Sequence, residues 1–243
     1  MKRLFKKWFS PGIDIALRYL PVTDVIRSDR MARPRILDVG SGTKGGVKYL
    51  GYPVIGLDRE FVGDIAEGLT PVRGDGLQLP FKDKSFDYVL SVDNLEHIPP
   101  DLRPLLIGEI LRVAKRRVFL AIPCGAFAEE QDRRLDRLYL RTHGERFPFF
   151  CEHVNYGLPE ENEILELLQR SGREKKIVIR SLSVIPNVNI VIREVYMRLW
   201  ISRWLALLYH PLVFFSFLRG WLNFGSCYRN LFVVDVEERG VIR

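Results

Sequence analysis

The amino-acid sequence predicts a doubly wound α/β fold built on a parallel sheet. Three observations indicate this: short apolar segments alternate with helical patterns, a glycine-rich turn follows the first segment, and an acid ends the second. The turn, Gly40–Gly46, follows Ile36–Val39. Gly40 and Gly42 lack a Cβ, so their backbone can adopt positive φ and a ligand can lie against it. Strand, glycine turn and helix in this order build nucleotide sites in such sheets.

Seven strands are expected along the chain. Most are short and nearly continuous in apolarity, as in strands that are buried on both faces of a parallel sheet. They are Ile36–Val39, Val54–Leu57, a short one near Val72, Phe86–Ser91, Arg117–Ile122, Ile177–Val184 and Tyr228–Val236. Helical patterns separate them, and Asp101 is the predicted N-cap of a helix whose apolar residues recur from Leu102 to Val113.

Length and composition indicate one globular domain. The 243 residues are enough for a substantial core, and 47% hydrophobic with 28% charged residues is not typical of disorder. The three cysteines, Cys124, Cys151 and Cys227, are widely spaced and odd in number, which favours reduced thiols in a cytoplasmic protein. No spacing of His, Asp, Glu or Cys predicts a metal site.

Four motifs occur in a diagnostic order. They are Asp38-Val39-Gly40-Ser41-Gly42, Val54-Ile55-Gly56-Leu57-Asp58, Gly74-Asp75-Gly76-Leu77-Gln78-Leu79-Pro80-Phe81, and Ser85-Phe86-Asp87-Tyr88-Val89-Leu90-Ser91 followed by Leu95-Glu96-His97. With them the chain resembles a class I S-adenosylmethionine-dependent methyltransferase of the small-molecule, type 11 branch, over about Arg33–Arg180 and the last strand. The resemblance implies a Rossmann-like seven-stranded sheet whose last strand returns antiparallel, and S-adenosylmethionine as the cofactor.

The resemblance also implies where the cofactor lies. Asp58 is expected to accept hydrogen bonds from the ribose hydroxyls. Asp75 and the backbone amides of Gly76 and Leu77 are expected at the adenine edge. The methionine end is expected beside Asp38, Gly40, Ser41 and Gly42, with Asp38 either contacting the cofactor or only bracing the turn. Asp93 completes the expected cofactor-binding set, and Asp93 and Glu96 are also placed to orient the methyl acceptor.

A hydroxyl acceptor benefits from a general base with a pKa near neutrality. His97, just after the fourth strand, is the first candidate for the catalytic base, and His153 is the second. The alternative for each is a hydrogen-bonded loop residue. His143 and His210 are expected to be structural.

Cys124 follows the fifth strand, where some RNA cytosine-5 methyltransferases place a catalytic cysteine. Their companion Pro-Cys is missing from Ser91-Val92-Asp93-Asn94, which also lacks the signature of amino methylation on nucleic-acid bases. We therefore expect Cys124 to be a small buried residue and nucleic acid not to be the substrate.

The single methyltransferase domain, 1–243, divides into four predicted segments. These are a basic N-terminal segment (1–32), a cofactor-binding core (33–186), an apolar helical insertion (187–226) and the last strand (227–238). The longest uncharged stretch of the insertion, Trp204–Leu218, is interrupted by Pro211 and falls short of the ~20 residues of a spanning helix. Because the insertion leaves the cofactor edge of the sheet between the sixth and seventh strands, we expect amphipathic helices that form a cap over the substrate.

The net charge of +7 is concentrated near the N-terminus: residues 1–35 hold nine Lys or Arg and three Asp, a balance of +6. In residues 2–9 the basic side chains alternate with Leu4, Phe5, Trp8 and Phe9. This pattern favours either a solvated terminus or peripheral contact with the inner face of an anionic membrane. No apolar segment with a cleavage site follows, so a signal peptide is not expected.

Together these observations favour a methyltransferase acting on a small-molecule hydroxyl, such as a sugar or a lipid-linked glycan. Two alternatives stay open at this point. One is a catalytically inactive partner subunit that still binds S-adenosylmethionine. The other is a nicotinamide oxidoreductase, which uses a similar glycine turn but for which no Tyr-x-x-x-Lys pair follows.

Overall fold

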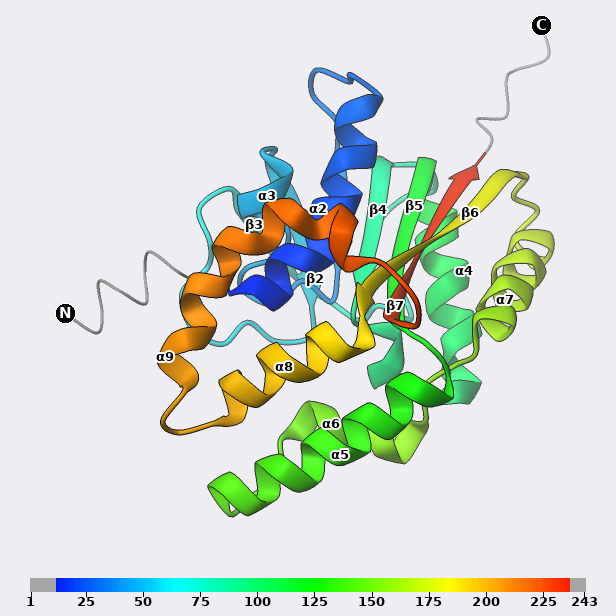
Figure 1. Cartoon of the computed structure of the whole chain (residues 1–243). Helices are drawn as coiled ribbons and strands as arrows, with labels where there is room; N and C mark the ends of the chain where they lie inside the picture. Colours follow the sequence, from blue (N-terminus) through cyan, green and yellow to red (C-terminus); the bar gives the residue numbers. More distant parts are fainter. Residues whose placement is uncertain (1–11, 237–243) are drawn as a thin grey trace, which may run out of the picture.

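The computed structural model describes residues 12–236, in which seven strands form one mixed sheet of order β3-β2-β1-β4-β5-β7-β6 (Figure 1). The strands are β1 (Ile36–Val39), β2 (Val54–Asp58), β3 (Leu69–Arg73), β4 (Phe86–Val92), β5 (Ala114–Pro123), β6 (Ile179–Asn189) and β7 (Cys227–Val236). The first five run parallel, and β7 lies antiparallel between β5 and β6. The predicted doubly wound sheet with an antiparallel last strand is therefore confirmed.

Helices connect the strands in alternation. The helices before β5 are α2 (Ile13–Ser28), α3 (Val47–Leu50), the 3-10 helices Leu95–His97 and Pro100–Leu102, and α4 (Arg103–Val113). Those after β5 are α5 (Gly125–His143), α6 (Pro148–Tyr156), α7 (Glu161–Glu174), α8 (Ile190–Ile201), α9 (Ala206–Tyr209) and the 3-10 helix His210–Leu222. The predicted cap Asp101 is wrong, because Pro100 starts a separate 3-10 turn and Leu102 becomes the N-cap of α4.

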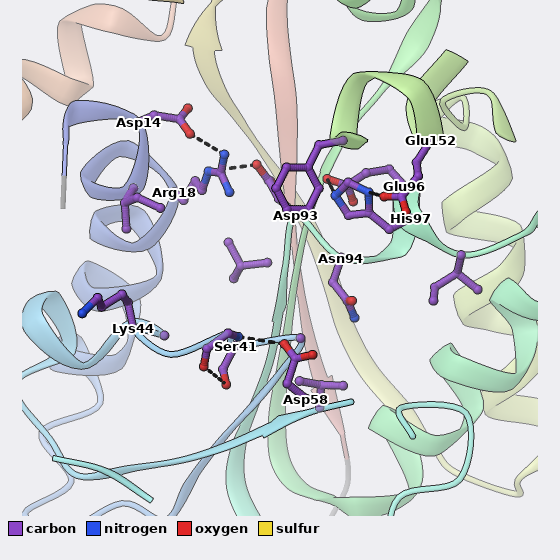
Figure 2. A pocket seen from close by; sticks show the side chains of 18 of the residues that line it. Asp14, Arg18, Ser41, Lys44, Asp58, Asp93, Asn94, Glu96, His97 and Glu152 are labelled. Atoms are coloured by element: carbon purple, nitrogen blue, oxygen red, sulfur yellow. Dashed lines mark hydrogen bonds and ion pairs between the residues drawn. The ribbon is translucent and has the colours of Figure 1, made fainter. Parts of the chain in front are cut away.

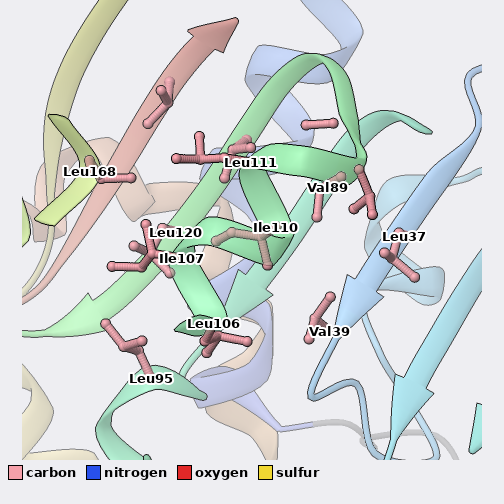
Figure 3. Close-up of a cluster of buried hydrophobic side chains, with 14 of the residues drawn as sticks. Leu37, Val39, Val89, Leu95, Leu106, Ile107, Ile110, Leu111, Leu120 and Leu168 are labelled. Carbon is pink, nitrogen blue, oxygen red and sulfur yellow. The ribbon is translucent and has the colours of Figure 1, made fainter. Parts of the chain in front are cut away.

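Side chains that alternate along each strand bury two faces of the sheet. On one face, Leu37, Val89 and Leu120 contact α4 and α7 through residues such as Ile110 and Leu168 (Figure 3). On the opposite face, the alternate strand residues pack against α2 and α3. The sheet is thereby covered on both sides and its carboxyl edge is left for the site.

The N-terminal segment is more integrated than the sequence indicated. The predicted basic segment 1–32 includes α2, which buries Tyr19, Val22 and Ile26 against the sheet. Pro21 lies inside this helix and obscures its helical signal in the sequence. The basic residues 2–9, for which membrane contact was predicted, lie outside the described residues.

Helices α5 and α6 after β5, and α8 and α9 after β6, lie together beyond one end of the sheet (Figure 1) and share a third apolar cluster with α2. Strand β6 continues through Asn189, so the first three residues of the predicted insertion belong to the sheet. The β7 ladder extends to the pair Asn189–Cys227, and Pro186 is tolerated because β6 is an edge strand. Within residues 12–236, no helix is long and apolar enough to cross a membrane.

Candidate functional site

The glycine turn has the backbone geometry that its sequence predicts. Gly40 and Gly42 adopt φ of 78° and 53°. A Cβ on Gly40 would approach Asn94 to 2.4 Å, and one on Gly42 would project into open space. The amide of Gly42 donates to Oδ2 of Asp58 at 2.8 Å, which ties the turn after β1 to the end of β2.

Asp38 braces this turn from below. Its carboxylate is fully buried, and Oδ2 accepts hydrogen bonds from the Tyr19 hydroxyl at 3.0 Å and the Gly46 amide at 3.1 Å. Burial raises the pKa of Asp38 to about 7, despite these two hydrogen bonds. Asp38 does not line the cavity described next, so its placement supports the bracing role and not a direct contact with the cofactor.

A cavity of about 740 Å³ opens at the carboxyl edge of the sheet, between β1 and β4, where the strand order reverses. In Figure 2, Ser41 and Asp58 lie on one side of this cavity and Glu96 and His97 on another. Predicted site residues that line it are Gly40, Ser41, Gly42, Asp58, Asp75, Gly76, Asp93, Glu96, His97 and His153. Leu77 is not among the lining residues, and its amide donates to Oδ1 of Asp75 at 2.9 Å.

The residues on the glycine side fit a nucleoside cofactor with a ribose diol. Asp58 offers a carboxylate at the end of β2, and Gly42 leaves space that a side chain would fill. Asp75 lies at the next strand end, where its second partner is the exposed side chain of Arg59, at 3.1 Å. The arrangement provides acceptors for hydroxyl and amine groups along one wall.

The two candidate catalytic histidines meet on the other side. His97 lies on the 3-10 helix after β4 and His153 on α6, and their ring centroids are 4.9 Å apart. Nδ1 of His97 lies 2.7 Å from Oε2 of Glu152, and Nδ1 of His153 shares a 2.7 Å hydrogen bond with Oδ2 of Asp132. The hydrogen bond to Asp132 orients the His153 ring, whereas Nδ1 of His97 is close to a carboxylate but has no hydrogen-bond partner in the described part of the chain.

Burial and the neighbouring His153 lower the pKa of His97 to about 3. The imidazole is therefore neutral at pH 7, and it accepts a proton only weakly. Burial and the charge of Asp93 raise the pKa of the neighbouring Glu96 well above its usual value. The electrostatics thus weaken the predicted role of His97 as a general base.

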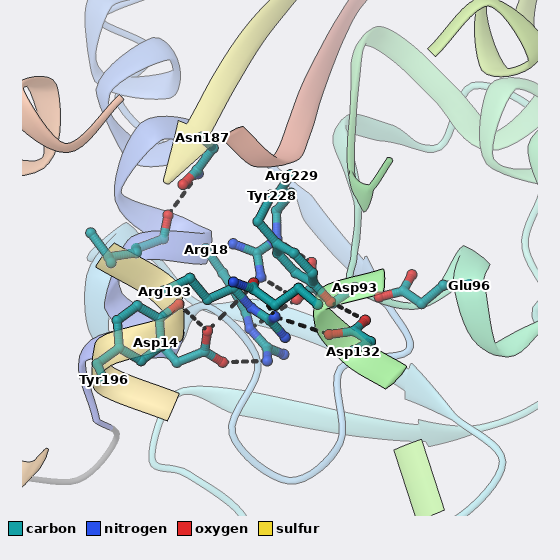
Figure 4. A network of polar contacts seen from close by, with 12 residues as sticks. Asp14, Arg18, Asp93, Glu96, Asp132, Asn187, Arg193, Tyr196, Tyr228 and Arg229 are labelled. Carbon is teal, nitrogen blue, oxygen red and sulfur yellow. Dashed lines mark hydrogen bonds and ion pairs between the residues drawn. The ribbon is translucent and has the colours of Figure 1, made fainter. Parts of the chain in front are cut away.

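A buried network of charges, absent from the sequence prediction, joins the site to the cap (Figure 4). Asp93, which has φ of 46°, forms ion pairs with Arg18 and Arg229. On the other side, Nη1 of Arg193 lies 2.9 Å from Oδ1 of Asp132, and its guanidinium stacks 3.3 Å over the ring of Tyr228. Asp93 is therefore held by protein cations, which leaves it less available to the cofactor than expected.

Only part of this network was readable from the sequence. Asp14 and Arg18 form an ion pair one turn apart on α2, a spacing visible in the sequence. Burial raises the pKa of Asp14, but the charges of Arg18 and Arg229 outweigh burial and lower the pKa to about 2. The other members come from α5, α8, β7 and the residue after β4, whose proximity only the fold creates.

Cys124 follows β5 as the N-cap of α5 and packs beside the main core cluster. Burial, with the negative charge of Glu96, raises the pKa of its thiol well above the usual range. Because the nucleophile would be the thiolate, this environment does not favour a covalent role for Cys124.

Comparisons with known proteins agree with this geometry. A model of the methyltransferase domain family matches residues 37–122. A methyltransferase of undetermined activity from Mycolicibacterium paratuberculosis is 38% identical over 91 residues, covering 33% of this chain and 34% of that protein. A fatty-acid O-methyltransferase from Mycolicibacterium smegmatis is 35% identical over 94 residues, covering 33% of each. The chain thus matches about a third of the length of these curated relatives.

The fold comparison covers more of the chain. A Burkholderia thailandensis 1,6-didemethyltoxoflavin N1-methyltransferase, solved with S-adenosylhomocysteine bound, superposes with a TM-score of 0.50 and 14% identity, covering 90% of this chain and 77% of that one. At this identity the likeness concerns the fold. The family match identifies a methyltransferase domain over residues 37–122, and the 3-2-1-4-5-7-6 sheet with its antiparallel β7 is the Rossmann-like methyltransferase fold.

Proposed function

We propose that this protein transfers a methyl group from S-adenosylmethionine to a hydroxyl group of a small molecule, either a sugar or a lipid-linked glycan. The observation that carries the proposal is the single cavity that joins the glycine turn and Asp58 to His97 and His153. One wall suits the nucleoside and the other suits an acceptor. The glycan assignment is an expectation from the sequence, and the fatty-acid O-methyltransferase among the relatives supports an acceptor with a lipid part.

The residues of this chain position the two reactants. S-adenosylmethionine, when bound, supplies an electrophilic methyl group on a sulfonium sulfur. Asp58 and the turn hold the nucleoside, and the acceptor side is lined by Phe147, Phe149 and Trp200. The acceptor oxygen bonds to the methyl carbon as the carbon–sulfur bond breaks, the electron pair stays on sulfur, and the hydroxyl proton leaves to His97, His153 or water. Positioning the oxygen in line supplies much of the rate acceleration.

The cap offers a route for a lipid-linked acceptor. Trp200 and Tyr209 line the cavity, while Trp204 and Trp221 nearby in the sequence are 90% and 84% exposed. Further exposed apolar residues of the same segment are Leu205, Leu207, Leu208, Phe214, Phe215, Phe217 and Phe224. An exposed apolar surface of this kind commonly marks a partner or a membrane. We infer that this surface, which we call the aromatic face, contacts the membrane that carries the acceptor.

A direct test compares cofactors first and acceptors second. Calorimetry with S-adenosylhomocysteine and NAD in parallel should show binding of the former alone. Transfer of labelled methyl groups should then be screened across sugars, lipid-linked glycans and fatty acids. Binding without any transfer would favour the inactive partner subunit, and binding of NAD instead would contradict the cofactor assignment.

The histidines provide a second readout of the same proposal. His97→Ala should lower turnover by about 10²-fold or more with little change in S-adenosylhomocysteine affinity. His153→Ala reports on the second candidate in the same assay. If both variants turn over at the normal rate, neither imidazole takes part in the reaction.

A further inference from the structure

Glu96, His97 and His153 bring three metal-binding side chains together inside the cavity. Oε1 of Glu96 lies 4.0 Å from Nε2 of His97 and 4.0 Å from Nε2 of His153. One ligand atom from each residue lies within 4.8 Å of the others. Both imidazoles therefore direct the same nitrogen toward the same carboxylate oxygen.

The supporting contacts are those of metal-binding histidines. Such residues usually give their second ring nitrogen to a carboxylate, which fixes the tautomer and leaves the other nitrogen as a ligand. Here Nδ1 of His153 shares a 2.7 Å hydrogen bond with Oδ2 of Asp132, and Nδ1 of His97 lies 2.7 Å from Oε2 of Glu152 without hydrogen-bond geometry. A carboxylate thus lies behind each histidine, and both histidines face Glu96.

The Glu96 carboxylate needs a partner that the described residues do not supply. Its side chain is 0% exposed, and within residues 12–236 neither oxygen has a hydrogen-bond partner, nor has Nε2 of His153. A buried carboxyl group of this kind is normally hydrogen-bonded, paired with a cation or bound to a metal.

The arginines around Glu96 are bound elsewhere. Arg18 and Arg229 form ion pairs with Asp93, and Arg193 does so with Asp132. Arg103 donates to the backbone carbonyls of Ile98, Tyr156 and Gly157. None of these arginines therefore donates a hydrogen bond to Glu96.

We propose that Glu96, His97 and His153 bind a divalent transition-metal ion at the acceptor side of the cavity. Two imidazoles and one carboxylate suit Zn²⁺, Mn²⁺ or Fe²⁺, and three protein ligands leave an open coordination position. Bonds of about 2.0–2.2 Å require the donors to approach by some tenths of an ångström, which small side-chain rotations provide.

The open position lies in the cavity where the acceptor is proposed to bind. A metal ion there would hold the acceptor oxygen and lower the pKa of its hydroxyl group, so that the proton leaves to water before the methyl transfer. This role rests on the proposed function, but metal binding itself does not. With the ion on Nε2, neither histidine is needed as a base.

The test uses the full chain after treatment with a chelator and dialysis. Calorimetric titration with Zn²⁺ and with Mn²⁺ should show about one ion bound per chain. Glu96→Gln, which keeps the side-chain shape, should weaken binding by at least tenfold, and Glu152→Gln by about tenfold. His143→Gln is the matched control, because His143 lies outside the cluster and contacts the Ile201 carbonyl; its affinity should equal that of the unmodified protein.

A second measurement avoids variants altogether. The chain has four histidines, so their ring nitrogens can be followed by NMR in ¹⁵N-histidine-labelled protein. Substoichiometric Mn²⁺ should broaden the signals of His97 and His153 while those of His143 and His210 persist. The proposal is overturned if the folded protein binds neither ion, if Glu96→Gln binds as tightly as the unmodified protein, or if broadening affects all four rings equally. Affinity for S-adenosylhomocysteine, measured separately in the metal-free protein, reports on the cofactor site, so the two proposals can fail independently.

Discussion

At the scale of single residues, Asp58 combines two tasks at the cofactor side of the cavity. One carboxylate oxygen accepts a hydrogen bond from the Gly42 amide, and the carboxylate is proposed to bind the ribose hydroxyls. Asp58→Ala should therefore weaken S-adenosylhomocysteine binding at least tenfold, since each charge-assisted hydrogen bond is worth about 1.5–3 kcal/mol. Glu67→Ala, an exposed carboxylate outside the cavity, is the control for calorimetry. Equal affinities in the two folded variants would contradict the ribose assignment.

Asp38 gives a pH-dependent prediction. Its folded-state pKa of about 7 exceeds the ordinary value of 3.8, so the folded state holds this proton more tightly than the unfolded state. The contribution of Asp38 to stability is complete below about pH 4 and is lost as the pH rises to about 7, with an upper bound of about 4 kcal/mol at 1.36 kcal/mol for each pKa unit. Asp38→Asn cannot lose that proton. The stability of the variant relative to the unmodified protein should therefore rise between pH 5 and pH 8 in urea denaturation, and parallel stability profiles would exclude the effect.

At the scale of elements, the charged network connects the cap helices α5 and α8 to the sheet. Helix α8 contributes Arg193, which contacts Asp132 on α5 and Tyr228 on β7. Removing one partner of a buried ion pair leaves the other charge uncompensated. Docking of the cap therefore depends on charge pairing as well as on its apolar cluster.

Arg193→Met tests that dependence. The substitution leaves Asp132 without its cation and should lower the free energy of unfolding by about 3–5 kcal/mol. Arg198→Met on the same helix removes a more exposed ion pair with Glu194 and should cost less than about 1 kcal/mol. Urea denaturation compares the two variants, and similar midpoints would show that the buried network adds little to stability.

Individual elements also show what local sequence can predict. Buried strands can be recognised in the sequence as apolar runs. Asp58, the acid at the end of β2, can be recognised as a site residue from the sequence alone. Helix α2 was missed because Pro21 interrupts its pattern, and β6 was cut short because Pro186 and Asn187 are typical of loops. In both places tertiary packing outweighs local propensity.

At the scale of the whole molecule, the fold was predictable and much of the acceptor side was not. The strand order follows from the alternation of elements and the family resemblance. Proximity of His97 to His153 depends on how the links after β4 and β5 pack against each other, and proximity of Asp132 to Arg193 depends on the links after β5 and β6. Such contacts join residues far apart in sequence and leave no periodic signal, which is why no metal site was expected from spacing alone.

The aromatic face gives a prediction for the molecule as a whole. The same segment carries Arg198, Arg203 and Arg219. Arg198 and Arg219 form ion pairs with Glu194 and Asp24, so attraction to anionic lipid is expected to come largely from the basic residues 2–9. Binding to anionic vesicles should fall as salt rises and should weaken when residues 1–10 are removed. Co-sedimentation is the measurement.

Substitutions separate the apolar part of that interaction from the charged part. Trp204→Ser with Trp221→Ser should reduce vesicle binding, whereas Val62→Ser, an exposed apolar residue on another segment, should not. Absence of vesicle binding at low salt by the folded protein would restrict the aromatic face to lining the acceptor pocket or contacting another protein.

The position of β7 has a consequence for how the protein is made. This strand is the last of the seven in the chain, yet it lies inside the sheet and carries Tyr228 and Arg229 into the charged network. During synthesis, the edges of β5 and β6 that pair with β7 therefore stay unpaired until β7 has left the ribosome. Such unpaired edges are prone to pair wrongly. A chain stalled before Cys227 would have the glycine turn. It would lack both the closed sheet and the contacts that Tyr228 and Arg229 make in the charged network. Translation must therefore pass β7 before the chain can form the closed sheet and complete the charged network.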